Sequence, residues 1–232
     1  PALAATLERI GREGRAGFYE GPVGEELLSV LKGLGGRHEE SDFADAVGDY
    51  VTPISTEFRG NRVWQCPPNG QGVIALLLLN IMSGVDTYGD TPLSAMRIHH
   101  EIEAGRLAYR DRGAVLADPA FSDVPVEQML DPAYADKLRA LISNSSSLEP
   151  MPPSELPRHR STVYISVVDK DRNVCSLINT LFDGFGSGIM APDSGVLLHN
   201  RGQGFVVDPA HPNGIEGGKR PLHTIIPAMV TR

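Results

Sequence analysis

The chain has 232 residues, of which 41% are hydrophobic, and its formal net charge is −8. This length and composition suit one large folded domain or two small ones. An acidic chain without a run of Lys or Arg lacks the electrostatic basis for binding nucleic acid or an anionic membrane surface. Its longest apolar stretch, residues 73–81, is far shorter than the roughly 20 residues that a membrane-spanning helix needs.

Residues 1–150 are predicted to be mainly helical, because their apolar residues recur at helical spacing. Two helix starts carry clear signals. Thr91-Pro92 and Asp131-Pro132 each place a capping side chain before a proline at the first helical position. The predicted elements are a helix at 3–10, a helix at 23–33, a short helix from 43, an extended segment at 54–64, a buried helix at 73–81, a helix from 92 to about 110 and a helix at 132–142.

The second part of the chain has a different texture. A Pro- and Ser-rich loop spans residues 143–157, and β-branched strands are predicted at 163–168 and 174–181 with a turn at 169–173. Glycines at 184, 186 and 188 indicate a loop with close backbone approaches. A short strand at 196–198, a turn at 200–204 and an apolar stretch ending at Val230 complete the chain.

Thr162 stands at the head of the first of these strands, directly after Ser161 and the loop. If the chain is cut between these two residues, the new terminal threonine carries a hydroxyl and a free amine. A hydroxyl is a weak nucleophile until a base takes its proton. An α-amine, with an ordinary pKa of about 7.7–8.0, is suited to that task. The alternative is that Thr162 is an ordinary strand residue, since threonine favours strands.

Other polar clusters are explained more simply. His99, His100, Glu101 and Glu103 could suggest a metal site, but a charged helix face accounts for them. Cys66 and Cys175 form neither a metal-ligand spacing nor a disulfide framework, and we expect both to be small buried hydrophobic residues. We therefore expect no metal and no cofactor. A cysteine hydrolase using one of the two thiols is a weaker hypothesis, because no partner base lies near either in sequence.

Several blocks of the sequence resemble, in order, the γ-glutamyltranspeptidase family of N-terminal-nucleophile hydrolases. These blocks are Phe18-Tyr19-Glu20-Gly21, Thr52-Pro53-Ile54-Ser55, Phe58-Arg59-Gly60, residues 67–72, residues 162–169, Phe185-Gly186-Ser187-Gly188, residues 195–200 and Lys219-Arg220-Pro221-Leu222. The resemblance implies an α+β fold, part of an αββα sandwich, with a helical first half and a β-rich second half. Residues 1–160 would belong to the large subunit and 161–232 to the small subunit of one self-cleaving precursor.

The resemblance also implies roles for individual residues. Cleavage would fall between Ser161 and Thr162, and Thr162 would attack a γ-glutamyl amide to give an acyl-enzyme that water or an amino acid resolves. Thr180 matches a second threonine that hydrogen-bonds the nucleophile region, and Asn200 matches an asparagine near the substrate's amino acid end. Further parts of the family's site fall outside these 232 residues, so the chain alone is expected to be nearly inactive.

Departures from the family pattern concern the substrate. Phe182 replaces a common asparagine, and Gly204 replaces the carboxylate that holds the substrate ammonium. Arg201 stands where an acid or amide is usual, and His223 with Thr224 replaces a pair of serines. A buried ammonium needs an anionic partner, whereas Arg201 would favour an additional anion. The pattern resembles the branch that includes cephalosporin-acylase-like and oxamate-amidohydrolase-like members.

These observations define the expected partners. The partner is a small amide, bound by Asn200, Arg201, His223 and Thr224, and the two subunit pieces stay together; a homodimer is also compatible with the resemblance. There are two alternatives to hydrolysis of a γ-glutamyl amide. The substrate could be a different small amide, or the protein could be an inactive unit that serves only in binding. The sequence leaves the compartment open between cytoplasm, which is favoured, and periplasm.

Overall fold

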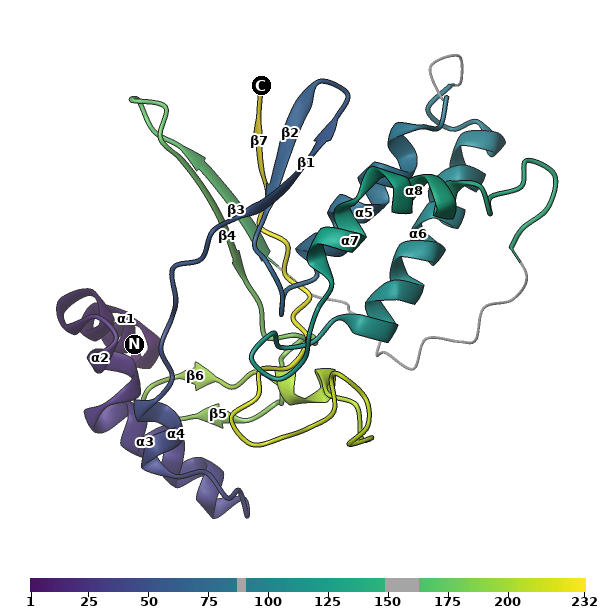
Figure 1. Cartoon of the computed structure of the whole chain (residues 1–232). Coiled ribbons are helices and arrows are strands. Elements are labelled where there is room, and N and C mark those ends of the chain that lie inside the picture. The colour runs from purple at the N-terminus through teal and green to yellow at the C-terminus, as the bar shows by residue number, and fades with distance from the viewer. Residues whose placement is uncertain (87–90, 149–162) are drawn as a thin grey trace. The chain divides into compact units, whose positions relative to one another are not determined.

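The computed structural model describes residues 1–86, 91–148 and 163–232 (Figure 1). The chain forms two compact units. The first combines Pro1–Tyr50 with Leu181–Asn200, and the second combines Val51–Thr180 with Arg201–Arg232. Ser161 and Thr162 lie outside the described residues. The division into a large-subunit region (1–160) and a small-subunit region (161–232), with the cut itself between Ser161 and Thr162, differs from these two units and stays a prediction.

The first unit consists of α1 (Ala2–Glu13), α2 (Ala16–Tyr19), α3 (Gly21–Gly33), α4 (Glu40–Ala44) and the short antiparallel strands β5 (Met190–Ala191) and β6 (Val196–Leu197). Val23 and Leu27 on α3 pack with Ala191 on β5 to form its core. Glu26 on α3 accepts hydrogen bonds from the amides of Asp193 and Ser194, at 2.6 and 2.8 Å. The turn between β5 and β6 is therefore fixed to α3.

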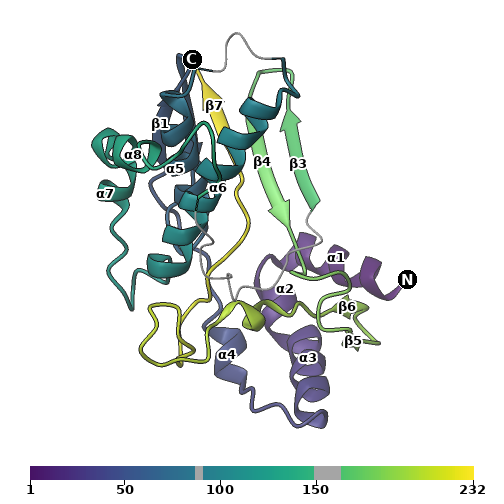
Figure 2. The same ribbon diagram turned by 90° about the vertical axis from the view of Figure 1, so that its right-hand side faces the viewer.

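The second unit is built around the helix α5 (Gly72–Ser83), which the sequence predicts as a buried helix, and its core side chains are almost completely inaccessible to solvent. Figures 1 and 2 show α5 beside α6 (Ala95–Val115), with α7 (Val126–Leu130) and α8 (Pro132–Arg139) also packed against α5. A continuous apolar face on α5 contacts all three neighbours, so this helix organises the core of the unit.

The two predicted helix caps have different outcomes. Asp131 accepts a hydrogen bond from the amide of Ala133, at 2.8 Å, and Pro132 opens α8 as predicted. The prediction for α6 is wrong at both ends. Ser94 rather than Thr91 provides the N-cap, because its hydroxyl accepts from the amide of Arg97 at 3.2 Å. The helix then continues to Val115, beyond the predicted end near residue 110.

The strands of the second unit form two sheets. β1 (Ile54–Phe58), β2 (Asn61–Gln65) and β7 (Met229–Thr231) are antiparallel in the order β1-β2-β7. β3 (Val163–Val168) and β4 (Val174–Asn179) form the predicted hairpin. Its turn is closed by Asp169, whose carboxylate accepts from the amides of residues 171 and 173, both at 2.8 Å. Helices and strands thus confirm the predicted α+β class.

Both cysteines are exposed, so the expectation that they are buried is wrong. Cys66 immediately follows the end of β2, and Cys175 lies on β4. The apolar side chains of β3 are exposed on both faces of its hairpin, and most of those on β4 are exposed as well. Cys175 is therefore exposed together with its apolar neighbours on β4.

Candidate active site

Arg201 and Thr224, both predicted to bind substrate, meet in the second unit. Arg201 opens the 3₁₀ helix η1 (Arg201–Gly204), and its Nη1 donates a hydrogen bond to Oγ1 of Thr224 at 2.9 Å. Only 6% of Arg201 is exposed. A guanidinium always carries its charge and offers five donors in a fixed plane. Arg201 is therefore a buried cation, and the hydroxyl of Thr224 helps to hold its guanidinium in place.

The backbone of His223 is paired with the loop that precedes α5. Its amide donates to the carbonyl of Asn69 at 3.0 Å, and its carbonyl accepts from the amide of Gln71 at 2.8 Å. The side-chain amide of Gln71 donates to the carbonyl of Thr224 at 3.0 Å. The loop that precedes α5 thus pairs with residues 223–224 and fixes their backbone.

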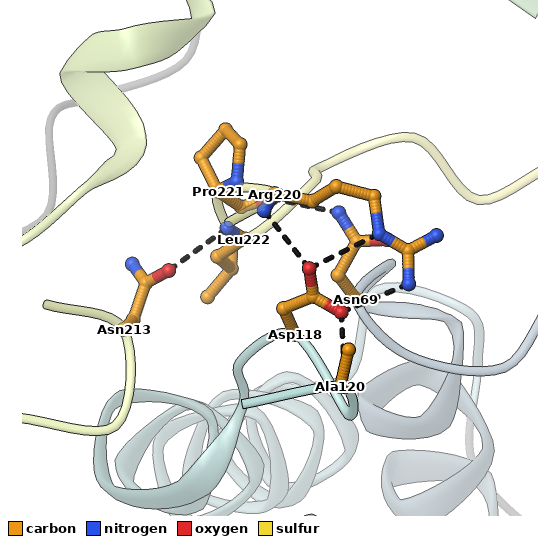
Figure 3. Close-up of polar contacts among 7 residues, drawn as sticks. All are labelled: Asn69, Asp118, Ala120, Asn213, Arg220, Pro221 and Leu222. Carbon is orange, nitrogen blue, oxygen red and sulfur yellow. Dashed lines mark hydrogen bonds and ion pairs between the residues drawn. The ribbon is translucent and has the colours of Figure 1, made fainter. Parts of the chain in front are cut away.

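An ion pair between the buried Asp118 and the half-exposed Arg220 anchors the same segment further upstream (Figure 3). Asp118 is 1% exposed, and its carboxylate accepts three hydrogen bonds from Arg220: from the amide at 2.9 Å, from Nε at 3.2 Å and from Nη2 at 2.9 Å. Burial alone would raise the pKa of this carboxyl, but the hydrogen bonds and charge of Arg220, with a bond from the amide of Ala120, lower the pKa to about 2. Asp118 therefore stays ionised and holds Arg220.

Gly204, which replaces the family's carboxylate, closes η1 against this segment. A Cβ atom at Gly204 would lie 3.2 Å from the carbonyl oxygen of Leu222 and 3.6 Å from Cβ of Pro221. A side chain here would force a neighbouring backbone group to shift. The absence of a carboxylate at this position therefore also allows close packing between η1 and residues 221–222.

Asn200 is the last residue of Leu181–Asn200, the part of the first unit that contains β5 and β6. Its side-chain amide donates to Asp183 at 2.7 Å and accepts from the backbone amide of Asp183 at 3.1 Å. Nearby, Phe182 is 3% exposed and has a φ of 82°, a conformation that asparagine tolerates better than phenylalanine. The substrate-binding role of Asn200 stays a prediction.

The remaining predicted residues are distributed as follows. Thr180 is half-buried and directly follows the end of β4. Ser161 and Thr162, the predicted cleavage site, fall in the part of the chain that is not described. The structure therefore brings together Arg201, His223 and Thr224, while it leaves the catalytic roles of both threonines as predictions.

Three anchoring residues were not predicted from the sequence: Asn69, Asp118 and Asn213, whose side-chain amide bonds to the backbones of Gly204 and Leu222. Asp118 precedes Pro119, and Asn213 stands between Pro212 and Gly214, so both have the local signature of turns. Their partners are not neighbours in sequence; Asp118 and Arg220, for example, are 102 residues apart. Only the turn character of these residues is readable in one sequence.

Over residues 1–86, 91–148 and 163–232, no group of three or more His, Cys, Asp or Glu side chains has an arrangement that could hold a metal ion. The two histidines of the charged α6 face contact other groups instead. His99 Nε2 lies 2.7 Å from the carbonyl of Ser143, and His100 Nε2 lies 2.8 Å from the side-chain oxygen of Asn144. Within the same ranges, no helix combines the length and apolar character needed to cross a membrane.

Comparison with known proteins places these features in a family. All of residues 1–232 match the family described as Gamma-glutamyltranspeptidase. The chain is 39% identical over 230 residues to the "Glutathione hydrolase-like YwrD proenzyme" of Bacillus subtilis (strain 168), covering 99% of this chain and 43% of the relative. It is 32% identical over 228 residues to the "Oxamate amidohydrolase proenzyme" of Klebsiella pneumoniae, covering 98% of this chain and 42% of the relative.

A solved structure shows the same fold. The cephalosporin acylase from Bacillus halodurans matches 100% of this chain with 41% of its own length, at 36% identity and a TM-score of 0.89. The chain therefore belongs to the γ-glutamyltranspeptidase family, and the predicted fold class, part of an N-terminal-nucleophile hydrolase sandwich, is confirmed. It spans less than half the length of the curated relatives described above.

Proposed function

We propose that the full-length protein is a self-processing amide hydrolase whose acyl substrate carries a carboxylate and no ammonium group. The precursor is cut between Ser161 and Thr162, giving pieces that end at residue 161 and begin at residue 162. The proenzyme names of its relatives support this processing step. Cleavage supplies the free amine that the threonine hydroxyl needs as a base.

The reaction balances as an acyl transfer to threonine and then to water. The hydroxyl oxygen of Thr162 attacks the amide carbonyl, and its proton passes through the α-amine to the departing amine. The acyl group is then held as an ester on Thr162. Water attacks this ester, the amine takes a proton from the water, and the acid leaves while the threonine hydroxyl is restored.

The register of the β3–β4 hairpin favours a role for Thr180 in assisting the nucleophile. Val163 pairs with Asn179, the residue that precedes Thr180. Thr162 is bonded to Val163, and consecutive Cα atoms are about 3.8 Å apart. Because antiparallel strands run in opposite directions, Val163 and Asn179 lie at one end of the hairpin, and their sequence neighbours there are Thr162 and Thr180. We therefore assign Thr180 to the support of the nucleophile rather than to direct attack.

The choice of acyl group rests on one observation: Arg201 is a buried cation bonded to Thr224, three residues before Gly204. An ammonium brought beside this guanidinium would meet a like charge and find no carboxylate at position 204. A carboxylate would instead gain a charge-assisted hydrogen bond. The oxamate amidohydrolase named among the relatives supports this, since oxamate is itself an amide with a carboxylate.

Two substrates that differ by one group test the proposal on purified full-length protein. Glutaryl-p-nitroanilide is γ-glutamyl-p-nitroanilide without its ammonium, and oxamate serves as a shorter probe. We expect kcat/KM to be at least about tenfold higher for the glutaryl compound, equivalent to about 1.4 kcal/mol. Equal or better activity on the γ-glutamyl compound would overturn the assignment of the acyl group.

Thr162→Ala is the control for the chemistry. Mass spectrometry of the wild-type protein should show two pieces that meet between Ser161 and Thr162, while the variant should remain one intact and inactive chain. Thr180→Val keeps the β-branched shape without the hydroxyl, and we expect it to lower kcat while processing continues. An intact wild-type chain that still hydrolyses the amides would rule out the threonine mechanism.

A further inference from the structure

Asn213 joins the two segments that carry Arg201 and Thr224. It is 1% exposed, and its side-chain Nδ2 donates to the carbonyl of Gly204 at 2.6 Å. Its Oδ1 accepts from the amide of Leu222 at 2.9 Å, a contact visible in Figure 3. Gly204 is the last residue of η1, which Arg201 opens, and Leu222 stands two residues before Thr224. One buried amide thus bridges the backbones of both segments.

The side chain at position 213 must be both a donor and an acceptor. The Gly204 carbonyl can only accept, and the Leu222 amide can only donate, so these neighbours fix which way the Asn213 amide points. An aspartate of the same shape would keep the bond from Leu222 but would set a carboxylate oxygen against the Gly204 carbonyl. An alanine would leave two buried polar groups without the partners they have now.

The segment around Leu222 has other anchors that do not involve Asn213. Asp118 holds Arg220, and the side-chain amide of Asn69 donates to the carbonyl of Pro221 at 2.8 Å. These contacts fix residues 220–221 to the helical part of the unit. Asn213 adds the link from this fixed segment to Gly204. Its loss is therefore expected to shift η1, and Arg201 with it, while residues 220–224 keep their place.

We propose that Asn213 is a positioning residue for the acyl-carboxylate site: it sets the spacing between η1 and residues 222–224, and so aims the Arg201 guanidinium. The inference rests on the proposed function, because it assumes that Arg201 contacts the carboxylate of the substrate. A residue with this role affects substrates that carry the carboxylate and has little effect on substrates that lack it.

The test compares two acyl groups of the same shape in full-length Asn213→Asp and wild-type protein. Glutaryl-p-nitroanilide carries the carboxylate, and 4-carbamoylbutyryl-p-nitroanilide has a neutral amide in its place. We expect Asn213→Asp to lower kcat/KM for the glutaryl compound by about 10- to 100-fold, mainly through KM, since a misplacement of about 1 Å can cost ~10²-fold. The neutral compound should change less than about threefold, which corresponds to under 1 kcal/mol.

Asn80 provides a matched control, because it is also a buried asparagine that bridges two segments of the second unit. It accepts from the hydroxyl of Thr56, and its Nδ2 donates to the carbonyl of Leu130 at 3.2 Å. Asn80→Asp should lower the melting temperature and change kcat/KM for both substrates by the same factor. If Asn213→Asp also lowers kcat/KM for both substrates by the same factor, Asn213 is only structural and the proposal is overturned.

The outcomes separate this proposal from the one on which it rests. If the wild-type protein does not prefer the glutaryl to the carbamoyl compound, the assignment of the acyl group fails before Asn213 is considered. If that preference exists and survives in Asn213→Asp, only the positioning role fails. Should the aspartate variant not fold or self-process, Asn213→Ser places a small hydroxyl at the site, and the same ratio of kcat/KM values supports or overturns the role.

Discussion

Replacing Asp118 by asparagine should destabilise the protein by an amount that depends on pH. The pKa of this carboxyl falls from its ordinary 3.8 to about 2 in the folded state, since the bonds and charge of Arg220 outweigh the opposing effect of burial. Each pKa unit corresponds to about 1.4 kcal/mol, so the ionised carboxylate contributes roughly 2 kcal/mol to the free energy of unfolding near neutral pH. Asp118 is almost completely buried, but the Arg220 side chain is 51% exposed, so solvent screens part of this interaction and about 2 kcal/mol is its upper bound.

The direction of the pH dependence follows from the lowered pKa. The stabilisation is fully present well above pH 3.8, where the carboxylate is ionised in both folded and unfolded chains. It is lost as the pH falls through about 2, where the folded carboxyl also takes up a proton. The difference between wild type and Asp118→Asn should therefore be largest at neutral pH and should shrink as the pH falls below about 4.

Urea unfolding of the full-length protein at a series of pH values between 7 and 3 measures this difference. Asp136→Asn is the matched control, because it removes an Asp–Arg pair in the same unit whose carboxylate is largely exposed. Exposed pairs contribute about 0–1 kcal/mol. A constant wild-type-to-variant difference from pH 7 to 3, or a loss no larger than that of Asp136→Asn, would refute the role given to the buried carboxylate.

Three further substitutions have defined outcomes. Arg201→Gln should lower kcat/KM for glutaryl-p-nitroanilide by about tenfold or more, with little change for the neutral carbamoyl compound, as a charge-assisted bond is lost. Glu103→Gln should lower the free energy of unfolding by about 2 kcal/mol, because the buried carboxylate of Glu103 accepts a hydrogen bond from the amide of Leu148 at 3.0 Å. The same variant should be cleaved faster by protease near Leu148. Arg139→Met should cost about 2 kcal/mol in urea unfolding, since Nε and Nη2 donate at 2.7 and 2.8 Å to the last carbonyls of α5.

Elements specified by local chemistry could be predicted from the sequence. The Asp131-Pro132 cap and the hairpin turn at Asp169 depend on side chains that bond to backbone groups two to four residues away. The start of α6 shows the limit of this approach. Thr91 and Ser94 are both acceptable caps, and nothing within the segment ranks one above the other. Packing of α6 against α5 adds information that the local sequence lacks.

The candidate site was predicted in part for a similar reason. Family-like blocks drew attention to Arg201, His223 and Thr224, and the structure brings these residues together. Asn213 could not be predicted, because its two side-chain hydrogen bonds reach residues nine positions away on either side, across irregular backbone. Such contacts follow no helical or strand periodicity. A single sequence offers only composition there, and composition indicated a turn.

The β3–β4 hairpin is specified by its local sequence, but its apolar side chains are left exposed. Val163, Tyr164 and Ile165 alternate between its faces, yet all three are apolar or aromatic and exposed in the described chain. Strands that are apolar on both faces are typical of sheets covered on both sides, as in the sandwich fold of the family. The relatives are more than twice as long as this chain. We therefore expect the hairpin that leads away from Thr162 to be covered in the full-length protein, where desolvation strengthens the electrostatic contacts of the proposed site.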